Sequence, residues 1–174
     1  MSNISCGTQN RILNIEMAKV PLSTKSKYKN GFYIPKNPEK YVGDVKNIIY
    51  RSSWEKRVCE WFDTTSAIVH WNSEGLIVDY FYPQSGKFHK YHIDFIASIK
   101  NRHGEVNKYA IEIKPAKEKV LPSTKDKKRF AIEMLTYTKN QAKWIAAKTF
   151  CAQHGMQFIV LDEYDLGIKQ RPKK

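Results

Sequence analysis

Residues 91–114 read Tyr-His-Ile-Asp-Phe-Ile-Ala-Ser-Ile-Lys, then Asn-Arg-His-Gly-Glu-Val, then Asn-Lys-Tyr-Ala-Ile-Glu-Ile-Lys. Apolar residues alternate with other residues in the first and last of these runs, and a polar segment containing glycine separates them. Because successive side chains on a strand point to opposite faces, this pattern predicts a β-hairpin with strands at 91–100 and 107–114. Each strand is expected to have one apolar face.

Three charged residues share the other face of the predicted hairpin. Asp94 lies on the first strand, and Glu112 and Lys114 lie two residues apart on the second. Mg²⁺ is usually held by one or two protein carboxylates together with water and substrate phosphate. We therefore interpret Asp94 and Glu112 as ligands of a divalent cation, and Lys114 as the group that orients or helps to deprotonate an attacking water. The alternative is three ordinary residues on a solvated strand face, where Glu-x-Lys sequences are common.

The composition indicates a single domain with a polyanionic partner. The chain has 174 residues, 30 of them basic and 17 acidic, which gives a formal net charge of +13. That charge favours nucleic acid as the partner. A membrane is not expected, because no apolar run approaches the length needed to span a bilayer and no signal peptide pattern opens the chain. The three cysteines are far apart, which argues against a disulfide framework or a zinc site and favours a reducing cytoplasm.

A helix is predicted to begin near Ser52. Ser52 and Glu55 have the spacing of a capping box, and the apolar residues that follow recur at helical spacing. The residues expected to be buried on this helix are Trp54, Val58, Trp61 and Phe62. The cap alone would explain Glu55, and the alternative is that the same carboxylate also reaches the metal region.

The remaining elements predict an α/β (α+β) fold, with a mixed central β-sheet of four or five strands flanked by helices. Strands are expected at 68–72 and 76–82, separated by a turn in which Glu74 is a turn residue or a further acidic group near the site. A long helix from about 128 to 154 follows, which His154-Gly155 is expected to end as a C-cap. A break is expected near 136–138. Apolar residues on two faces predict that the helix is covered on two sides, with Trp144 buried. A strand at 156–161 then implies a parallel crossover.

An excess of basic residues follows the second strand of the hairpin. The residues expected to contact the DNA backbone are Lys117, Lys125, Lys127, Lys128 and Arg129. The default for such a charge run is a solvated loop. On the long helix, Gln141 interrupts an apolar face, so it either extends to the surface or points into the catalytic cleft.

Asp94 followed by Glu112-Ile113-Lys114 resembles the core of PD-(D/E)XK nucleases, with Ile93 where the motif has Pro. Further segments resemble the head completion nuclease family of T-even-like tailed phages, itself similar to the endonuclease subunit of Tn7-type transposases. The segments that carry this resemblance are 38–43, Arg51-Ser-Ser-Trp-Glu55, Trp71-Asn-Ser-Glu74, Asn140-Gln-Ala-Lys-Trp144 and Phe158-Ile-Val-Leu161. The resemblance covers about residues 31–166.

The resemblance implies a restriction-endonuclease-like fold and a Mg²⁺-dependent DNA endonuclease that acts in phage head completion after DNA packaging, with Mn²⁺ able to replace Mg²⁺. It implies Asp94, Glu112 and the backbone carbonyl of Ile113 as metal ligands, Lys114 as the catalytic lysine and Glu55 as the acidic residue on the helix. DNA, and portal or neck proteins, are the implied partners. The implied location is the cytoplasm of the infected host, with association with the virion.

These expectations divide the chain into a flexible basic arm at 1–30, a nuclease domain at 31–166 and a basic tail at 167–174. A rival hypothesis is a structural head or neck protein that binds DNA or the portal and keeps the fold without catalysis. A third is a restriction or Holliday-junction enzyme, which would share the chemistry but use dimer symmetry. Binding alone gives little reason to hold Asp, Glu and Lys together, which favours the nuclease.

Overall fold

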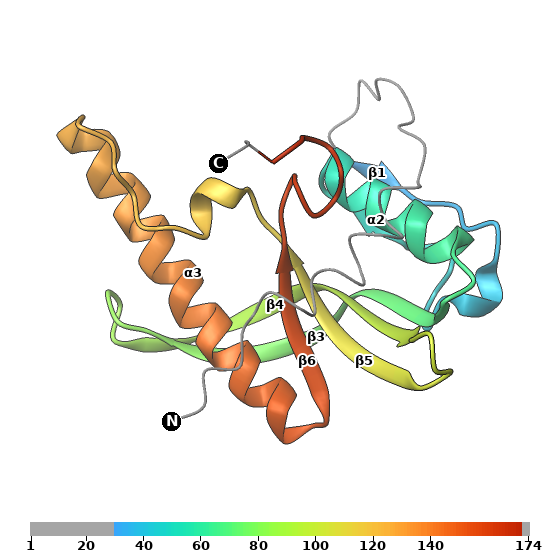
Figure 1. The fold of residues 1–174 in the computed structure, drawn as a ribbon. Coiled ribbons are helices and arrows are strands. Elements are labelled where there is room, and N and C mark those ends of the chain that lie inside the picture. Colours follow the sequence, from blue (N-terminus) through green and yellow to red (C-terminus); the bar gives the residue numbers. More distant parts are fainter. Residues whose placement is uncertain (1–29, 172–174) are drawn as a thin grey trace.

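The computed structural model describes residues 30–171 and shows an α+β fold (Figure 1). The elements in order are β1 (Gly31–Phe32), η1 (Pro38–Lys40), β2 (Ile49–Tyr50), α2 (Ser53–Thr64), β3 (Ile68–Tyr82), β4 (Lys87–Lys100), β5 (Val106–Ile113), η2 (Ala116–Glu118), α3 (Lys127–Gln153) and β6 (Met156–Leu161). β3 to β6 form a mixed sheet in sequence order, and β1 pairs with β2. None of the described helices is long and apolar enough to cross a membrane. The predicted arm lies outside the described residues, apart from Asn30.

The predicted hairpin is confirmed. β4 and β5 pair in antiparallel fashion from Lys100 opposite Val106 to Phe95 opposite Ile111. β6 lies parallel to β5, as expected for a crossover through α3. β4 begins earlier than predicted, and its first half pairs only with β3. The β3–β4 ribbon therefore extends beyond the end of β5.

The predicted turn between 72 and 75 is wrong, because β3 is one continuous strand with a bulge at this place. Ser73 pairs with Phe95, and the next pair joins Leu76 to Ile93, so two residues of β3 lie opposite Asp94 alone. Glu74 adopts a φ of 55°, and a Cβ atom at Gly75 would collide with the side chain of Asn72. Turns and bulges need the same unusual backbone conformations, so the sequence signal did not distinguish them.

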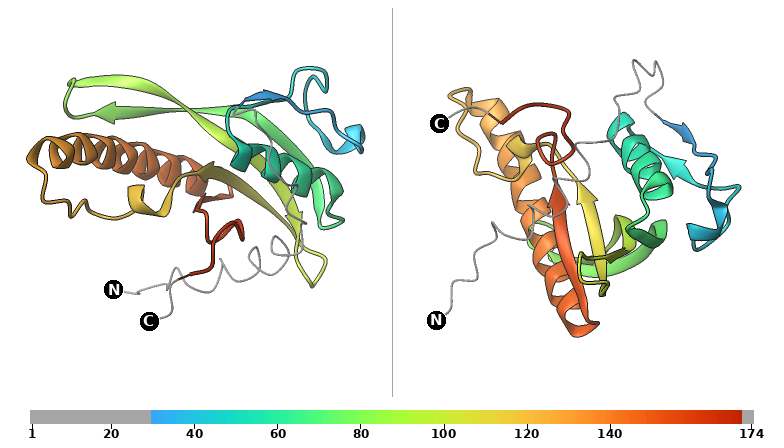
Figure 2. Two further views of the ribbon diagram at one scale, coloured as in Figure 1. Left: turned by 90° about the horizontal axis from the view of Figure 1, so that it is seen from above. Right: turned by 45° about the vertical axis from the view of Figure 1, so that its right-hand side comes forward.

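The sheet is packed on two sides, with α3 and α2 on opposite sides of β5 and β6 (Figure 2). Ala110 and Ile111 are neighbours on β5, yet Ala110 packs in a cluster with α3 and Ile111 in a cluster with α2. The predicted burial of Ile93, Phe95, Ile111, Ile113, Val58, Trp61, Phe62 and Trp144 is confirmed, and Trp54 is partly buried. The expectation of one apolar face is wrong for β5, because its other face packs against α3 through Ala110.

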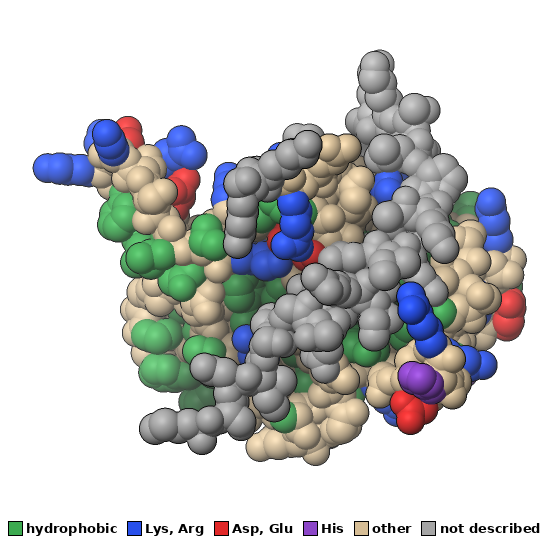
Figure 3. Space-filling model, viewed as in Figure 1, with side chains coloured by type: hydrophobic (Ala, Val, Ile, Leu, Met, Phe, Trp, Pro, Cys, Tyr) green, Lys and Arg blue, Asp and Glu red, His purple; other side chains and the backbone are tan. Residues whose placement is uncertain are grey.

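α3 is one unbroken helix of 27 residues, so the predicted break is wrong. Its predicted coverage on two faces is also wrong: exposed apolar side chains include Ile132 at 65% and Leu135 at 52%, and apolar side chains lie along the α3 side of the molecule (Figure 3). A helix of this length spans about 40 Å, whereas the six residues of β6 span about 20 Å. The first half of α3 therefore extends past the sheet. Gly155 ends the helix with φ 65°, as predicted.

Asp63 anchors the segment that precedes α2. Its side chain is fully buried and accepts hydrogen bonds from the Tyr33 hydroxyl at 2.8 Å and from the backbone N–H groups of Lys36 and Asn37 at 2.7 and 2.8 Å. These donors lie in an extended, proline-containing segment that has few backbone partners of its own. The carboxylate of Asp63, at the end of α2, thus accepts hydrogen bonds that the backbone of a neighbouring strand would otherwise accept.

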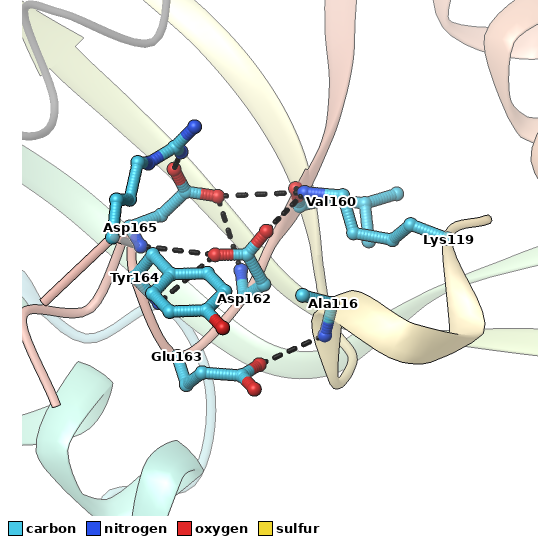
Figure 4. A network of polar contacts seen from close by, with 8 residues as sticks. Ala116, Lys119, Val160, Asp162, Glu163, Tyr164 and Asp165 are labelled. Carbon is cyan, nitrogen blue, oxygen red and sulfur yellow. Dashed lines mark hydrogen bonds and ion pairs between the residues drawn. The ribbon is translucent and has the colours of Figure 1, made fainter. Parts of the chain in front are cut away.

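The loop after β6 is fixed against the loop after β5 by ion pairs (Figure 4). The ammonium group of Lys119 lies 2.7 Å from the carboxylate of Asp162 and 3.5 Å from that of Asp165. Glu163 accepts a hydrogen bond from the backbone N–H of Ala116 at 2.8 Å. The three acidic residues are buried, so these contacts connect the two ends of the β5–α3–β6 crossover.

The predicted tail is held in part by the same loop. The guanidinium group of Arg171 lies 2.6 Å from Asp165, and the ammonium group of Lys169 lies 3.6 Å from Glu163. Leu166, at the predicted domain boundary, is fully buried. Packing therefore reaches the last described residues.

We expect Asp63→Ala to lower the free energy of unfolding by about 3 kcal/mol, because it leaves buried donors without an acceptor. Urea unfolding followed by tryptophan fluorescence measures the change. Glu39→Ala is the control, since Glu39 is exposed in the same segment and should change stability by less than about 0.5 kcal/mol. Equal effects of the two substitutions would show that Asp63 is not an anchor.

We expect Lys119→Met to destabilise the protein by about 3 kcal/mol at pH 7, since it leaves the buried carboxylate of Asp162 without its cation. Burial acts to raise the pKa of Asp162, but Lys119 and backbone N–H groups outweigh it and hold the pKa below its ordinary value. This stabilisation is present above the unfolded-state pKa of about 4 and is lost as the pH falls through the lower folded-state pKa.

The difference between wild type and Lys119→Met should therefore shrink below about pH 4. Urea unfolding at pH 7 and pH 3 measures it. Lys169→Met removes an exposed cation from the same loop and should cost less than about 1 kcal/mol. A loss for Lys119→Met that is independent of pH would assign its role to packing instead.

Candidate active site

Asp94, Glu112 and Lys114 meet where β4 separates from β5. Ladder pairing between the strands ends at Phe95 and Ile111. Beyond that point the carboxylate of Asp94 accepts a hydrogen bond from the backbone N–H of Ile113 at 2.7 Å. The ammonium group of Lys114 lies 3.1 Å from a carboxylate oxygen of Glu112. The three residues that the sequence placed on one face are thus together at the end of β5.

The bulge in β3 explains this separation. The extra residue lies directly opposite Asp94, and a bulge increases the local twist of the strands that it joins. The twisted β3–β4 ribbon leaves the last residues of β5 without a backbone neighbour on that side. Asp94 supplies the missing acceptor for Ile113, and this contact fixes the direction of its carboxylate.

Both carboxylates are shielded from water, so the alternative of a solvated strand face is wrong. Glu112 is 2% exposed. Burial and the neighbouring charge of Glu112 raise the pKa of Asp94 to about 8. Burial alone would lower the pKa of Lys114, but the Glu112 and Asp94 carboxylates outweigh it and raise the pKa. Lys114 is therefore an ammonium ion at neutral pH.

The donor set fits a hard divalent cation. Oxygen Oε2 of Glu112 is buried and makes no hydrogen bond to any of the described residues, and Asp94 shares the same low-dielectric site. Within residues 30–171, no group of three or more His, Cys, Asp or Glu side chains is arranged to hold a metal. Two carboxylates completed by water and phosphate suit Mg²⁺, whereas zinc requires nitrogen or sulfur ligands that this site lacks. Ile113, the third predicted ligand, lies between Glu112 and Lys114 and is the last residue of β5.

Glu55 serves as a helix cap and lies near the site. Ser52 accepts a hydrogen bond from the backbone N–H of Glu55 at 3.1 Å, which confirms Ser52 as the N-cap. The Glu55 carboxylate in turn accepts from the backbone N–H of Arg51 at 2.7 Å. After burial and Glu112, the Glu55 charge also contributes to the raised pKa of Asp94. The two interpretations of Glu55 are therefore compatible.

An ion pair between Arg51 and Glu74 borders the site. The guanidinium group of Arg51 contacts both carboxylate oxygens of Glu74, at 2.6 and 3.1 Å. These hydrogen bonds lower the pKa of Glu74. Glu74 is thus a bulge residue whose charge is neutralised by Arg51. No sequence pattern predicted this ion pair between Glu74 and Arg51.

Sequence reasoning missed Lys143. Its ammonium group on α3 lies 4.9 Å from the centre of the Tyr91 ring. Burial lowers the pKa of Lys143, and the charges of Glu112, Lys114 and Asp94 also act on it. Lys143 is one of two lysines in the second half of α3, so its residue type alone did not set it apart.

Apart from Gln141, the predicted DNA-binding residues follow Lys114 in the chain, from Lys117 to Arg129, and are exposed. Lys117 lies on η2, Lys125 on the loop before α3, and the others on its first turn; basic side chains gather at this end of the helix (Figure 3). Arg129 pairs with Glu133 at 2.8 Å. Gln141 is half-buried on the second half of α3. Their role in DNA binding stays a prediction.

Comparison with known proteins agrees with the fold. The family model described as TnsA-like endonuclease N terminal matches residues 65–163, a span that contains Asp94, Glu112 and Lys114. The head completion nuclease of Enterobacteria phage T4 is 39% identical over 140 residues, which cover 77% of this chain and 91% of the relative. No solved structure matches significantly. The chain therefore belongs to the TnsA-like endonuclease family and is a relative of the T4 head completion nuclease.

Proposed function

We propose that this protein is a Mg²⁺-dependent DNA endonuclease that hydrolyses phosphodiester bonds during phage head completion. The observation that carries the proposal is the pair of shielded carboxylates, Asp94 and Glu112, at one end of β5 with an ammonium group 3.1 Å from Glu112. Membership of an endonuclease family supports nuclease activity. The name of the T4 relative supports a role in head completion.

In this proposal Asp94 and Glu112 hold the cation, with Mn²⁺ able to replace Mg²⁺. When bound, the cation supplies a Lewis acid for the phosphate and lowers the pKa of a coordinated water. Asp94 keeps its orientation through the Ile113 N–H. Lys114 is protonated at neutral pH, which favours charge stabilisation and orientation of water over direct proton abstraction.

The partners and location follow from charge and family. The net charge of +13 supports DNA as the substrate, bound mainly through its phosphates. We further propose portal or neck proteins as partners, the cytoplasm of the infected host as the place of action, and association with the virion. The T4 relative's role in head completion is the support for these points.

The rival is a DNA-binding or portal-binding structural protein that keeps the fold without catalysis. Placing two carboxylates together in a shielded site costs free energy, and binding alone does not require it. A plasmid nicking assay with and without Mg²⁺ separates the two functions. Cleavage that requires the cation supports the nuclease, and DNA binding without cleavage in Mg²⁺ or Mn²⁺ supports the structural protein.

We expect Asp94→Ala and Glu112→Ala each to abolish Mg²⁺ binding and cleavage while DNA binding persists, because they remove ligands and not phosphate contacts. Lys114→Ala should retain the cation and lose about a hundredfold in the cleavage rate. Calorimetric Mg²⁺ titration and plasmid cleavage measure these effects. Lys108→Ala, an exposed residue on the same strand, is the control and should cleave normally. Retained cleavage by Glu112→Ala would remove the nuclease assignment of this site.

Neutralising Lys125, Lys127 and Lys128 together to Gln should weaken DNA binding and reduce the slope of log affinity against log salt by about 2 to 3, because each phosphate contact releases about one counterion. Duplex binding measured at several salt concentrations without divalent metal gives the slope. The control replaces three exposed lysines on other segments, Lys36, Lys46 and Lys100. If both triple variants change the slope equally, the loop before α3 is only a solvated charge run.

A further inference from the structure

α3 places one lysine beside the candidate active site. The ammonium group of Lys143 lies 4.9 Å from the ring centre of Tyr91 and 5.8 Å from that of Tyr80. Tyr91 precedes Asp94 by three residues on β4. Tyr91 also packs in the cluster that contains Trp144 of α3 and Ala110 of β5, and Ala110 lies two residues before Glu112 on the same face. Lys143 therefore approaches the carboxylates from the helix side of the sheet.

Lys143 has no carboxylate partner among the described residues. Two other half-buried lysines near the ends of β5 and β6 do have one: Lys114 pairs with Glu112 at 3.1 Å and Lys119 pairs with Asp162 at 2.7 Å. Within residues 30–171, the ammonium group of Lys143 contacts two tyrosine rings and no carboxylate. Burial lowers its pKa. A half-buried cation without a counter-ion gains free energy when an anion comes close to it.

The surroundings strengthen such an interaction. The Tyr91 hydroxyl and the indole N–H of Trp144 are buried, and burial and the neighbouring Glu112 carboxylate raise the pKa of Tyr91. The surrounding aromatic rings keep the local dielectric constant low, so an ion pair between Lys143 and an anion would be stronger there than in water. The tyrosine rings also contact the ammonium group itself through cation–π interactions. The ammonium group is thus held in place without being neutralised.

The two lysines at the site differ in what their charges face. Lys114 forms an ion pair with Glu112, whereas Lys143 forms no ion pair with any described carboxylate. We propose that Lys143 binds the scissile phosphate of the DNA, as a second active-site cation beside Lys114. This inference rests on the proposed nuclease function and names the group that receives the phosphate.

Lys139 provides a matched comparison. It lies one helical turn earlier on α3 and also stands over a tyrosine, with its ammonium group 5.6 Å from the ring centre of Tyr82. Lys139 is exposed, and its positive charge is a minor cause of the lowered pKa of Lys143. If cation–π packing were the whole role of these lysines, their removal should have similar effects.

The test compares Lys143→Met, Lys143→Arg and Lys139→Met in the full chain. We expect Lys143→Met to lower the single-turnover cleavage rate by about thirtyfold or more, the scale seen on removal of a group that stabilises transition-state charge. Mg²⁺ affinity measured by calorimetry should stay within twofold, because Lys143 is no metal ligand. Lys143→Arg should recover at least a third of the wild-type rate, and Lys139→Met should stay within threefold of it.

Three outcomes would overturn the inference: Lys143→Met cleaving within threefold of wild type, equal losses for Lys143→Met and Lys139→Met, or a loss of Mg²⁺ affinity that accounts for the lower rate. Melting temperatures of all variants show whether each is folded. Should Lys143→Met be unstable, Lys143→Gln gives the same comparison with a polar side chain. If wild-type protein fails to cleave in Mg²⁺ or Mn²⁺, the proposed function itself fails; cleavage by wild type and by Lys143→Met alike overturns only the assignment of Lys143.

Discussion

The hydrogen bond from the Ile113 N–H to the Asp94 carboxylate is the constraint on which the site depends. It forms because the bulge in β3 turns the β3–β4 ribbon away from β5, which leaves the end of β5 without a ladder partner. A side chain then performs the task that a backbone carbonyl performs elsewhere in the sheet. The same contact holds one carboxylate of β4 beside the carboxylate of β5. The separation of β4 from β5 therefore also places the carboxylate of Asp94 beside that of Glu112.

The pair of carboxylates is unfavourable by itself. Asp94 is shielded, faces the charge of Glu112 and has a raised pKa as a result, and Lys114 offsets only part of the repulsion. Proteins tolerate such arrangements where function requires them. A divalent cation would relieve the repulsion and satisfy the free oxygen of Glu112. Binding of the proposed cation would therefore also stabilise the folded protein.

The sequence predicted the parts of this fold that depend on local pattern. Alternation located β4 and β5, the Ser52 to Glu55 spacing located the start of α2, and Gly155 located the end of α3. The failures arose where local signals are ambiguous. The sequence from Asn72 to Gly75 is compatible with both a turn and a bulge, and only the pairing register of β3 against β4 distinguishes them.

Other features depend on contacts between distant segments, which a single sequence does not reveal. The exposed first half of α3 depends on the length of the sheet beside it. Lys143 becomes notable only through its position near Tyr91, and Lys119 through the acidic loop after β6. Of the candidate site, the core residues Asp94, Glu112 and Lys114 could be found from spacing. The positively charged residue on α3 could not.

The order of synthesis adds a consequence for β6. The strand that bears Glu112 has β6 as its neighbour on one side, and the backbone N–H of Lys114 donates to the carbonyl of Leu161 at 3.0 Å. β6 and the loop that binds Lys119 follow β4, β5 and α3 in the sequence, so they leave the ribosome after these elements. Until then β5 is an edge strand, and the β5–α3–β6 crossover is open. During synthesis, Asp94 and Glu112 therefore lie in an incomplete sheet. The candidate active site is assembled only after β6 has been translated.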